Sequence, residues 1–251
     1  MALMEAVHKE LKMQKKLLLL SLIFFSTLTL IGCVNIPEPI PLQIPSDDKV
    51  NIGVILTEPP EAAAQYTGNI GLLDLAIISG ANSALNSHLK TLTFEDYEAL
   101  PAQIVEILEA RGFHAQVIDQ VIPRDIAKKL SSHKEGLSQN DFLPYLDNID
   151  VDYVLLLNMS AIGTTRPYYG FLPTAPPQAN TALWGELVNL GSKKVFWYKG
   201  INSLKTIPEP WDEPDQGYPN LTNAVYLSLN EVLEMVKVEL GNPEAEKVSA
   251  K

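Results

Sequence analysis

The sequence predicts an α/β (α+β) fold, a single three-layer-like domain in which helices pack on a mixed sheet of about five strands. Three observations support this expectation. Val50–Thr57 and Asp152–Ile162 are short, nearly continuous apolar segments, as buried strands are. Pro101–Arg111 has apolar residues along one face of a helix. Ala182–Leu190 and Val195–Ser203 flank a short polar turn, which indicates a hairpin.

The remaining elements give the order β-α-β-α-β-β-β-α. A helical insert, Gly68–Leu92, follows the first strand, because its apolar residues recur at helical spacing. Phe113–Ile118 comes after the Pro101–Arg111 helix and predicts a second strand. Asn220–Leu240 carries a continuous apolar stripe and predicts a long final helix. Two short helices are expected in the polar connection before the third strand, at Arg124–Leu130 and Asp141–Leu146.

The N-terminal region has the layout of a secretory signal peptide. Two lysines precede the apolar run Leu17–Leu30, and Gly32 and Cys33 follow it. The run is shorter than the roughly 20 residues that a permanent membrane-spanning helix needs. We therefore expect residues 1–32 to be removed. Met13 is the expected true start, because the stretch before it contains two glutamates.

The segment Leu30-Ile31-Gly32-Cys33 resembles the lipobox of bacterial lipoproteins. This resemblance implies cleavage between Gly32 and Cys33 and acylation of Cys33, the only cysteine in the chain. Val34 follows the cysteine where an Asp would imply retention, so the resemblance implies transfer to the outer membrane. The expected location is the periplasmic face of that membrane, with the acyl chains on Cys33 as the attachment. Each buried CH₂ of such a chain contributes about 0.8 kcal/mol.

Composition limits the partners of the mature chain. Residues 33–49 combine the lipidated cysteine with a proline-rich tether that would reach roughly 50 Å if extended. Residues 50–241 are the expected periplasmic domain, and 242–251 a disordered tail. Without the leader's four lysines and two glutamates, 15 basic and 28 acidic residues remain, a net charge of −13. Such a charge argues against nucleic acid as a partner.

The element order after a proline-rich tether is similar to that of lipoproteins carrying a domain like the N-terminal domain of TolB. This group includes the peptidoglycan-synthase activator LpoB and the curli secretion lipoprotein CsgG. The resemblance covers about residues 50–240 as a pattern, and it implies an assembly factor or secretion component rather than an enzyme. It is carried by the lipobox at Cys33, the strands Val50–Thr57 and Asp152–Ile162, the helix Pro101–Arg111, and the hairpin ELVNLGSKKVFWYKG.

Two proline-rich segments, Thr164–Ala179 and Lys205–Pro219, are expected to be long loops at the same end of the sheet. Stiff loops that present aromatic residues are suited to binding a partner. Alternatively, these aromatics fold back and cover the end of the sheet. The candidate partner-binding residues are Arg166, Tyr168, Tyr169, Phe171, Trp211 and Tyr218.

A row of small residues, Ala76, Gly80 and Ala84, lies within the helical insert. Small residues at this spacing allow another backbone to approach closely. The row therefore predicts either an internal helix packed on the sheet, or a contact with another copy or with the membrane.

The sequence contains no arrangement typical of catalysis. It lacks the G-x-S-x-G elbow, the phosphate-binding loop and the H-E-x-x-H motif. His88, His114 and His133 do not have metal-ligand spacing, and Asp147, Asp150 and Asp152 lack the glycine and glutamate of a calcium loop. We expect no catalytic residue, metal, cofactor or small-molecule substrate.

The expected function is therefore that of a lipid-anchored periplasmic binding or assembly module, whose partners are other envelope proteins or further copies of itself. An alternative is a pore-forming or secretion-channel subunit of the CsgG type, for which the two hairpin strands are borderline in length. An envelope hydrolase is the third alternative.

Overall fold

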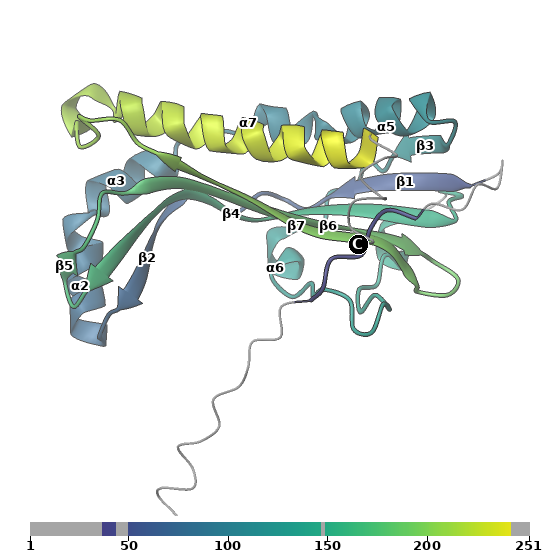
Figure 1. Ribbon diagram of the computed structural model, residues 1–251, viewed down its shortest axis with the longest axis horizontal. Helices are drawn as coiled ribbons and strands as arrows, with labels where there is room; N and C mark the ends of the chain where they lie inside the picture. Colours follow the sequence, from purple (N-terminus) through teal and green to yellow (C-terminus); the bar gives the residue numbers. More distant parts are fainter. Residues whose placement is uncertain (1–36, 44–49, 147–148, 242–251) are drawn as a thin grey trace, which may run out of the picture. The chain divides into compact units, whose positions relative to one another are not determined.

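One mixed sheet organises the computed structural model, which describes residues 37–43, 50–146 and 149–241. Five strands cross it in the order β3-β1-β4-β6-β7 (Figure 1). The strands β3, β1 and β4 are parallel, whereas β6 and β7 continue the sheet as antiparallel neighbours. Two further strands, β2 and β5, pair only with β4. The bounds are β1 Asn51–Leu56, β2 Ala63–Asn69, β3 His114–Val117, β4 Tyr153–Tyr169, β5 Leu172–Pro173, β6 Gln178–Asn189 and β7 Val195–Thr206.

Helices cover both faces of the sheet, which confirms the expected mixed α/β class. The helices α5 and α7 lie on one face, over a large core that includes Ile104, Leu155 and Trp197 (Figure 1). On the other face, α6 and the turn η2 cover a smaller core around Leu156 and Phe142. The helical bounds are α2 Leu72–Ala81, α3 Ser83–Leu89, α4 Glu95–Glu98, α5 Leu100–Ala110, α6 Arg124–Ala127, η2 Leu143–Tyr145, η3 Pro214–Gln216 and α7 Pro219–Gly241.

The long strand β4 joins two parts of the sheet. It pairs in parallel with β1 up to Leu157, and then with β2 from Gly163 onward. On its other edge β6 runs antiparallel, with a bulge between Met159 and Ala161. Gly163 has φ +131°, and a Cβ at this position would lie 2.3 Å from the carbonyl oxygen of Ala63. Only glycine therefore lets β2 approach β4 this closely.

The segment Thr164–Ala179, which the sequence predicts as a loop, is mostly strand. β4 continues to Tyr169, a tight turn leads into β5, and β6 begins at Gln178. The loop expectation was wrong because this part of β4 is a strand through its pairing with β2, which the segment's four prolines do not prevent. The partner strand, β2, has the sequence AAQYTGN, which lacks apolar alternation, and its last two residues are the first two of the expected helical insert.

Part of the expected tether belongs to the folded unit. The N–H and C=O of Ile40 pair with Tyr198 of β7 at 2.9 Å each, and the N–H of Gln43 donates to Phe196. Residues 37–43 are thus attached to the outer edge of β7 and are not a free spacer.

Several predictions concern residues outside the described ranges. They are the signal peptide, the cleavage between Gly32 and Cys33, the lipidation of Cys33, and the tail 242–251. Among the described residues, no helix combines the length and the apolar character that crossing a bilayer requires.

Tyr97 of α4 closes the place where β1 ends beside β4. Its buried hydroxyl lies 3.1 Å from the carbonyl oxygens of both Thr57 and Leu157, and it accepts the N–H of Met159 at 3.3 Å. Burial raises the pKa of Tyr97 to about 12, so the hydroxyl stays protonated and remains a donor. One side chain therefore binds the carbonyl of Thr57 and the N–H of Met159, and it shares the carbonyl of Leu157 with the N–H of Thr57.

We predict that Tyr97→Phe lowers the free energy of unfolding by about 1–3 kcal/mol, because it leaves buried backbone groups without a partner. Urea denaturation measures the change. Tyr226→Phe is the matched control, since the Tyr226 hydroxyl donates to the carbonyl of Thr93 at an exposed position. The control should change stability by less than about 0.5 kcal/mol. Equal effects of the two variants would contradict the role of Tyr97.

Candidate docking surface

The structure brings the two predicted aromatic segments together around Arg166. Its guanidinium lies 4.9 Å from the ring centroid of Trp211 and 5.9 Å from that of Tyr168. Its Nε donates to the carbonyl of Ala175 at 2.9 Å, which fixes the side chain across the β4–β5 turn. Arg166 therefore joins the two segments and is not a free cation for a partner.

Two of the six predicted residues are buried, so the prediction of an exposed aromatic surface is wrong for them. Tyr168 is only 5% exposed and packs edge-on against Tyr66, with ring centroids 5.7 Å apart. Tyr218 is also buried and lies against His88. Tyr168 and Tyr169 point to opposite faces of this part of β4, which the sequence predicts as a loop, so the sequence alone does not distinguish them.

The other aromatics of the turn are exposed, and they lie beside α2. Tyr169 is 70% exposed, and Phe171 and Leu172 are also exposed. A Cβ on Gly170 would lie 3.7 Å from the carboxylate of Asp74, which places α2 directly next to the turn. Figure 1 shows α2, β2 and β5 gathered at one end of the sheet.

Helix α2 exposes apolar residues on nearly all sides. Leu72 is 91% and Leu73 75% exposed, and Ile78 is the helix's one buried residue. The only charged residue, Asp74, accepts the N–H of Gly71 at 3.0 Å and so caps the helix. Together, α2 and the β4–β5 turn form an apolar surface that we call the apolar tip: Leu72, Leu73, Leu75, Ile77, Tyr169, Phe171 and Leu172.

The small-residue row does not form one continuous helical stripe. Ala76 and Gly80 lie on α2, but the helix ends at Ala81, and Ala84 lies on α3. All three small residues are exposed, and a Cβ on Gly80 would meet no atom within 4 Å. The expectation of an internal helix packed on the sheet is therefore wrong for this row, and α2 presents it to the surroundings.

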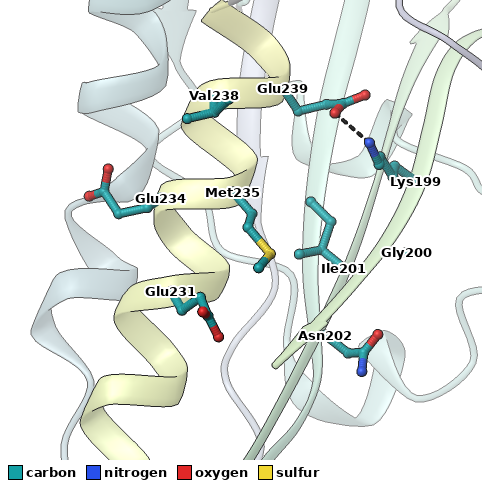
Figure 2. Close-up of a pocket in the computed structure, with 9 residues that line it drawn as sticks. All are labelled: Lys199, Gly200, Ile201, Asn202, Glu231, Glu234, Met235, Val238 and Glu239. Atoms are coloured by element: carbon teal, nitrogen blue, oxygen red, sulfur yellow. Dashed lines mark hydrogen bonds and ion pairs between the residues drawn. The ribbon is translucent and has the colours of Figure 1, made fainter. Parts of the chain in front are cut away.

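A groove of about 480 Å³ runs between α7 and β7. Figure 2 shows Met235 pointing toward Ile201 and Lys199 forming an ion pair with Glu239. A second ion pair, between Lys205 and Glu231, bridges the same two elements. Because its charged residues already pair across it, this groove offers fewer unsatisfied contacts than the apolar tip.

A buried carboxylate, Glu186 of β6, was not singled out from the sequence. Its Oε1 accepts hydrogen bonds from Asn140 at 2.6 Å and Ser138 at 2.8 Å, while Oε2 has no partner among the described residues. Burial raises the pKa of this carboxyl, and the two hydrogen bonds oppose the shift. Glu186 lies inside the smaller core, away from both the apolar tip and the groove, so its role there is structural.

The histidines do not converge. His88 pairs with Thr222 at 2.7 Å, and His133 pairs with the carbonyl of Glu38 at 2.9 Å. Within the described ranges, no group of three or more His, Cys, Asp or Glu side chains is placed to hold a metal ion.

No family model and no curated protein matches this chain. Solved structures with a similar course of the chain include bacterial lipoproteins. A PelC dodecamer from Paraburkholderia phytofirmans is 10% identical and has a TM-score of 0.36, covering 81% of this chain and 95% of that one. The lipoprotein GNA1162 from Neisseria meningitidis is 12% identical with a TM-score of 0.30, covering 74% of this chain and 99% of that one. The C-terminal domain of LpoB from Salmonella enterica is 13% identical with a TM-score of 0.19, covering 61% of this chain and 82% of that one. At these values the similarities assign neither a family nor a function.

We predict that Tyr168→Ala and Tyr169→Ala, at adjacent positions of β4, have opposite consequences. Tyr168→Ala should lower the free energy of unfolding by about 3–5 kcal/mol, because it empties a buried aromatic site. Tyr169→Ala should change it by less than about 0.5 kcal/mol. Thermal or urea denaturation of both variants measures the difference. A large loss with Tyr169→Ala would show that this ring belongs to the core.

We also predict a pH-dependent effect of Glu186→Gln. The folded-state pKa of Glu186 lies above its unfolded value, so the native state binds the proton more tightly and loses stability as pH rises through that value. Glu186→Gln removes this loss, so its stability relative to the wild type should increase between pH 4 and pH 7. Urea denaturation at both pH values measures the difference, and Glu231→Gln, whose carboxyl pKa is lowered by Lys205, should change with pH in the opposite direction. A pH-independent difference for Glu186→Gln would contradict the prediction.

Proposed function

We propose that this chain is a lipid-anchored binding or assembly module of the bacterial cell envelope, without catalytic activity, and that its apolar tip rests on the membrane surface. The observation that carries the proposal is the exposed apolar surface formed by α2 and the β4–β5 turn. Large contiguous apolar patches on a protein surface mark contacts with proteins or membranes.

Burying the apolar tip would release a considerable free energy. Fully burying a leucine side chain contributes about 1.5–3 kcal/mol, so Leu72 and Leu73 alone would contribute several kcal/mol. They are almost completely exposed, so nearly all of this gain is still available.

A membrane surface suits the apolar tip better than a protein partner does. Protein interfaces combine an apolar centre with a polar rim that makes hydrogen bonds. In α2 the only charged side chain, Asp74, is used for capping, and no basic residue lies on the helix. Tyr169 and Phe171 add the amphipathic and apolar aromatics that favour a membrane–water interface.

The position of the expected anchor supports the same occupant. Glu38 accepts a hydrogen bond from His133, so the chain reaches the domain on the side of the sheet that α6 covers. Figure 1 shows α2 and β2 extending toward that same side. A lipid on Cys33, which only three residues separate from Pro37 in the sequence, would favour a bilayer on this side.

We predict that protein exported by a leader that is removed before residue 34 stays partly in the membrane fraction of cells, because the apolar tip provides a second contact. Adding Leu72→Glu and Leu73→Glu should release it into the soluble fraction, since two charges would have to enter the interface. Thermal stability should hardly change, because both side chains are exposed in the folded protein.

The matched control adds Leu227→Glu and Val238→Glu on α7, which remove two other exposed apolar residues far from the tip in sequence. This control should leave membrane association unchanged. Complete release of the protein that lacks residues 1–33 but keeps an intact tip would contradict the membrane contact. Tip-dependent self-association of the purified protein, measured by light scattering, would instead identify a second copy as the occupant.

A further inference from the structure

A pocket opens where β4 changes neighbours. β1 pairs with β4 up to Leu157, and β2 begins to pair at Gly163. Between these points, β4 lacks a strand partner on this edge. Tyr97 fills the gap from the α5 side, and on the α6 side a cavity of about 320 Å³ remains. Its volume falls within the range typical of small-ligand sites.

The walls of the pocket come from four parts of the chain. Asn158 of β4 and Trp184 of β6 are cross-strand neighbours that form its base. Residues of α6 and its C-terminal end cover it, including Arg124 and Lys128, and Glu58 closes it beside the end of β1. The site therefore depends on the tertiary fold and on no local motif.

The pocket lies between two strands that share one edge of β4. From β1 the chain leads into β2, which pairs with the same strand further along, and β4 itself continues to Tyr169. The pocket therefore lies beside the middle of β4, in the interval between its two parallel partners.

Hydrogen-bond donors predominate in the pocket. Asn158 is 5% exposed, and its Oδ1 accepts the hydroxyl of Thr57 at 2.8 Å, while its amide nitrogen has no partner among the described residues. The Nε of Arg124 is buried and likewise has no partner in the described part of the chain. Lys128 makes no ion pair within the described ranges, so its charge is not neutralised by the protein.

The pocket has fewer hydrogen-bond acceptors than donors, and some of these acceptors already have partners in the protein. The carboxylate of Glu58 accepts the backbone N–H of Arg124 at 3.0 Å and lies 3.5 Å from its guanidinium. The carboxylate of Glu61 lies 3.5 Å from the same guanidinium, so the charge of Arg124 is already paired. The hydroxyl of Ser160 donates to the carbonyl of Ala182. Lys128 therefore carries the charge that a ligand can pair with, and the buried Nε–H of Arg124 favours a ligand that brings an acceptor.

We propose that this pocket binds a carboxylated sugar ring. The carboxylate of the sugar pairs with Lys128 and accepts a hydrogen bond from the Nε–H of Arg124. A ring hydroxyl accepts a hydrogen bond from the side-chain amide of Asn158. The apolar face of the ring packs on the indole of Trp184. Pro60, Ala127 and Leu130 supply the remaining apolar wall. This ligand class goes beyond the proposed membrane contact and does not depend on it, since no pocket residue belongs to the apolar tip.

The experiment is a saturation-transfer difference NMR titration of the full-length protein in detergent with N-acetylmuramic acid and N-acetylglucosamine. The two sugars differ by the lactyl group that carries the carboxylate, so the acid should bind at least 10-fold more tightly. Glucuronic acid tests whether another carboxylated pyranose is accepted, which distinguishes a wall-derived sugar from an acidic polysaccharide unit. Lactate tests whether the carboxylate alone suffices.

Lys128→Gln should weaken binding of the acid sugar about 10-fold, because it removes the unneutralised charge. Trp184→Phe should weaken binding of both the acid sugar and the neutral one. The control is Lys129→Gln, an exposed neighbour that does not line the pocket and should leave affinity unchanged.

Three binding results would overturn the proposal: equal binding of the acid and neutral sugars, binding of lactate as tight as that of the acid sugars, or no binding of either acid sugar. Equal effects of Lys128→Gln and Lys129→Gln on affinity would also overturn it. Because Lys128 is exposed, its replacement preserves the fold, and a melting curve checks this. Loss of the membrane contact in the tip variant would leave sugar binding intact, so the two proposals fail separately.

Discussion

The backbone hydrogen bonds of β4 are the constraint on which the rest of the structure depends. A buried strand of this length needs a partner for every N–H and C=O along both edges. β6 supplies one edge nearly throughout, while the other edge is shared by β1 and β2 with an interval between them. The side chain of Tyr97 fills that interval on one face and leaves a cavity on the other. The core, the pocket and the position of the apolar tip all follow from this division.

The sequence predicts the parts of the fold whose pattern is local. Apolar continuity identifies β1 and the first half of β4, and helical periodicity identifies α5 and α7 to within two residues of their observed ends. The hairpin of β6 and β7 is also recognised, although its strands are longer than expected. These elements bury one continuous face or both faces, so the residues themselves record the environment.

The sequence does not predict a strand that forms only because a neighbouring strand pairs with it. β2 is mostly exposed and has small and polar residues, and it is a strand because Gly163 allows it to lie against β4. For the same reason the sequence could place Arg166, Tyr169 and Phe171 at a surface but could not separate them from the buried Tyr168. The pocket residues Asn158, Trp184 and Lys128 lie far apart in the chain, and no spacing rule connects them before the sheet is known.

Because residues 37–43 are attached to β7, the prolines of this segment also determine which hydrogen-bonding groups the edge of the sheet exposes. Ile40 directs both its backbone groups at Tyr198, so Pro39 and Pro41 direct theirs away from β7. Proline has no N–H, and the outer side of this short segment therefore offers no donor at those two positions. A strand from another molecule would find only carbonyl oxygens there. The same stretch thus ends the sheet and protects that part of its edge from association with a further strand.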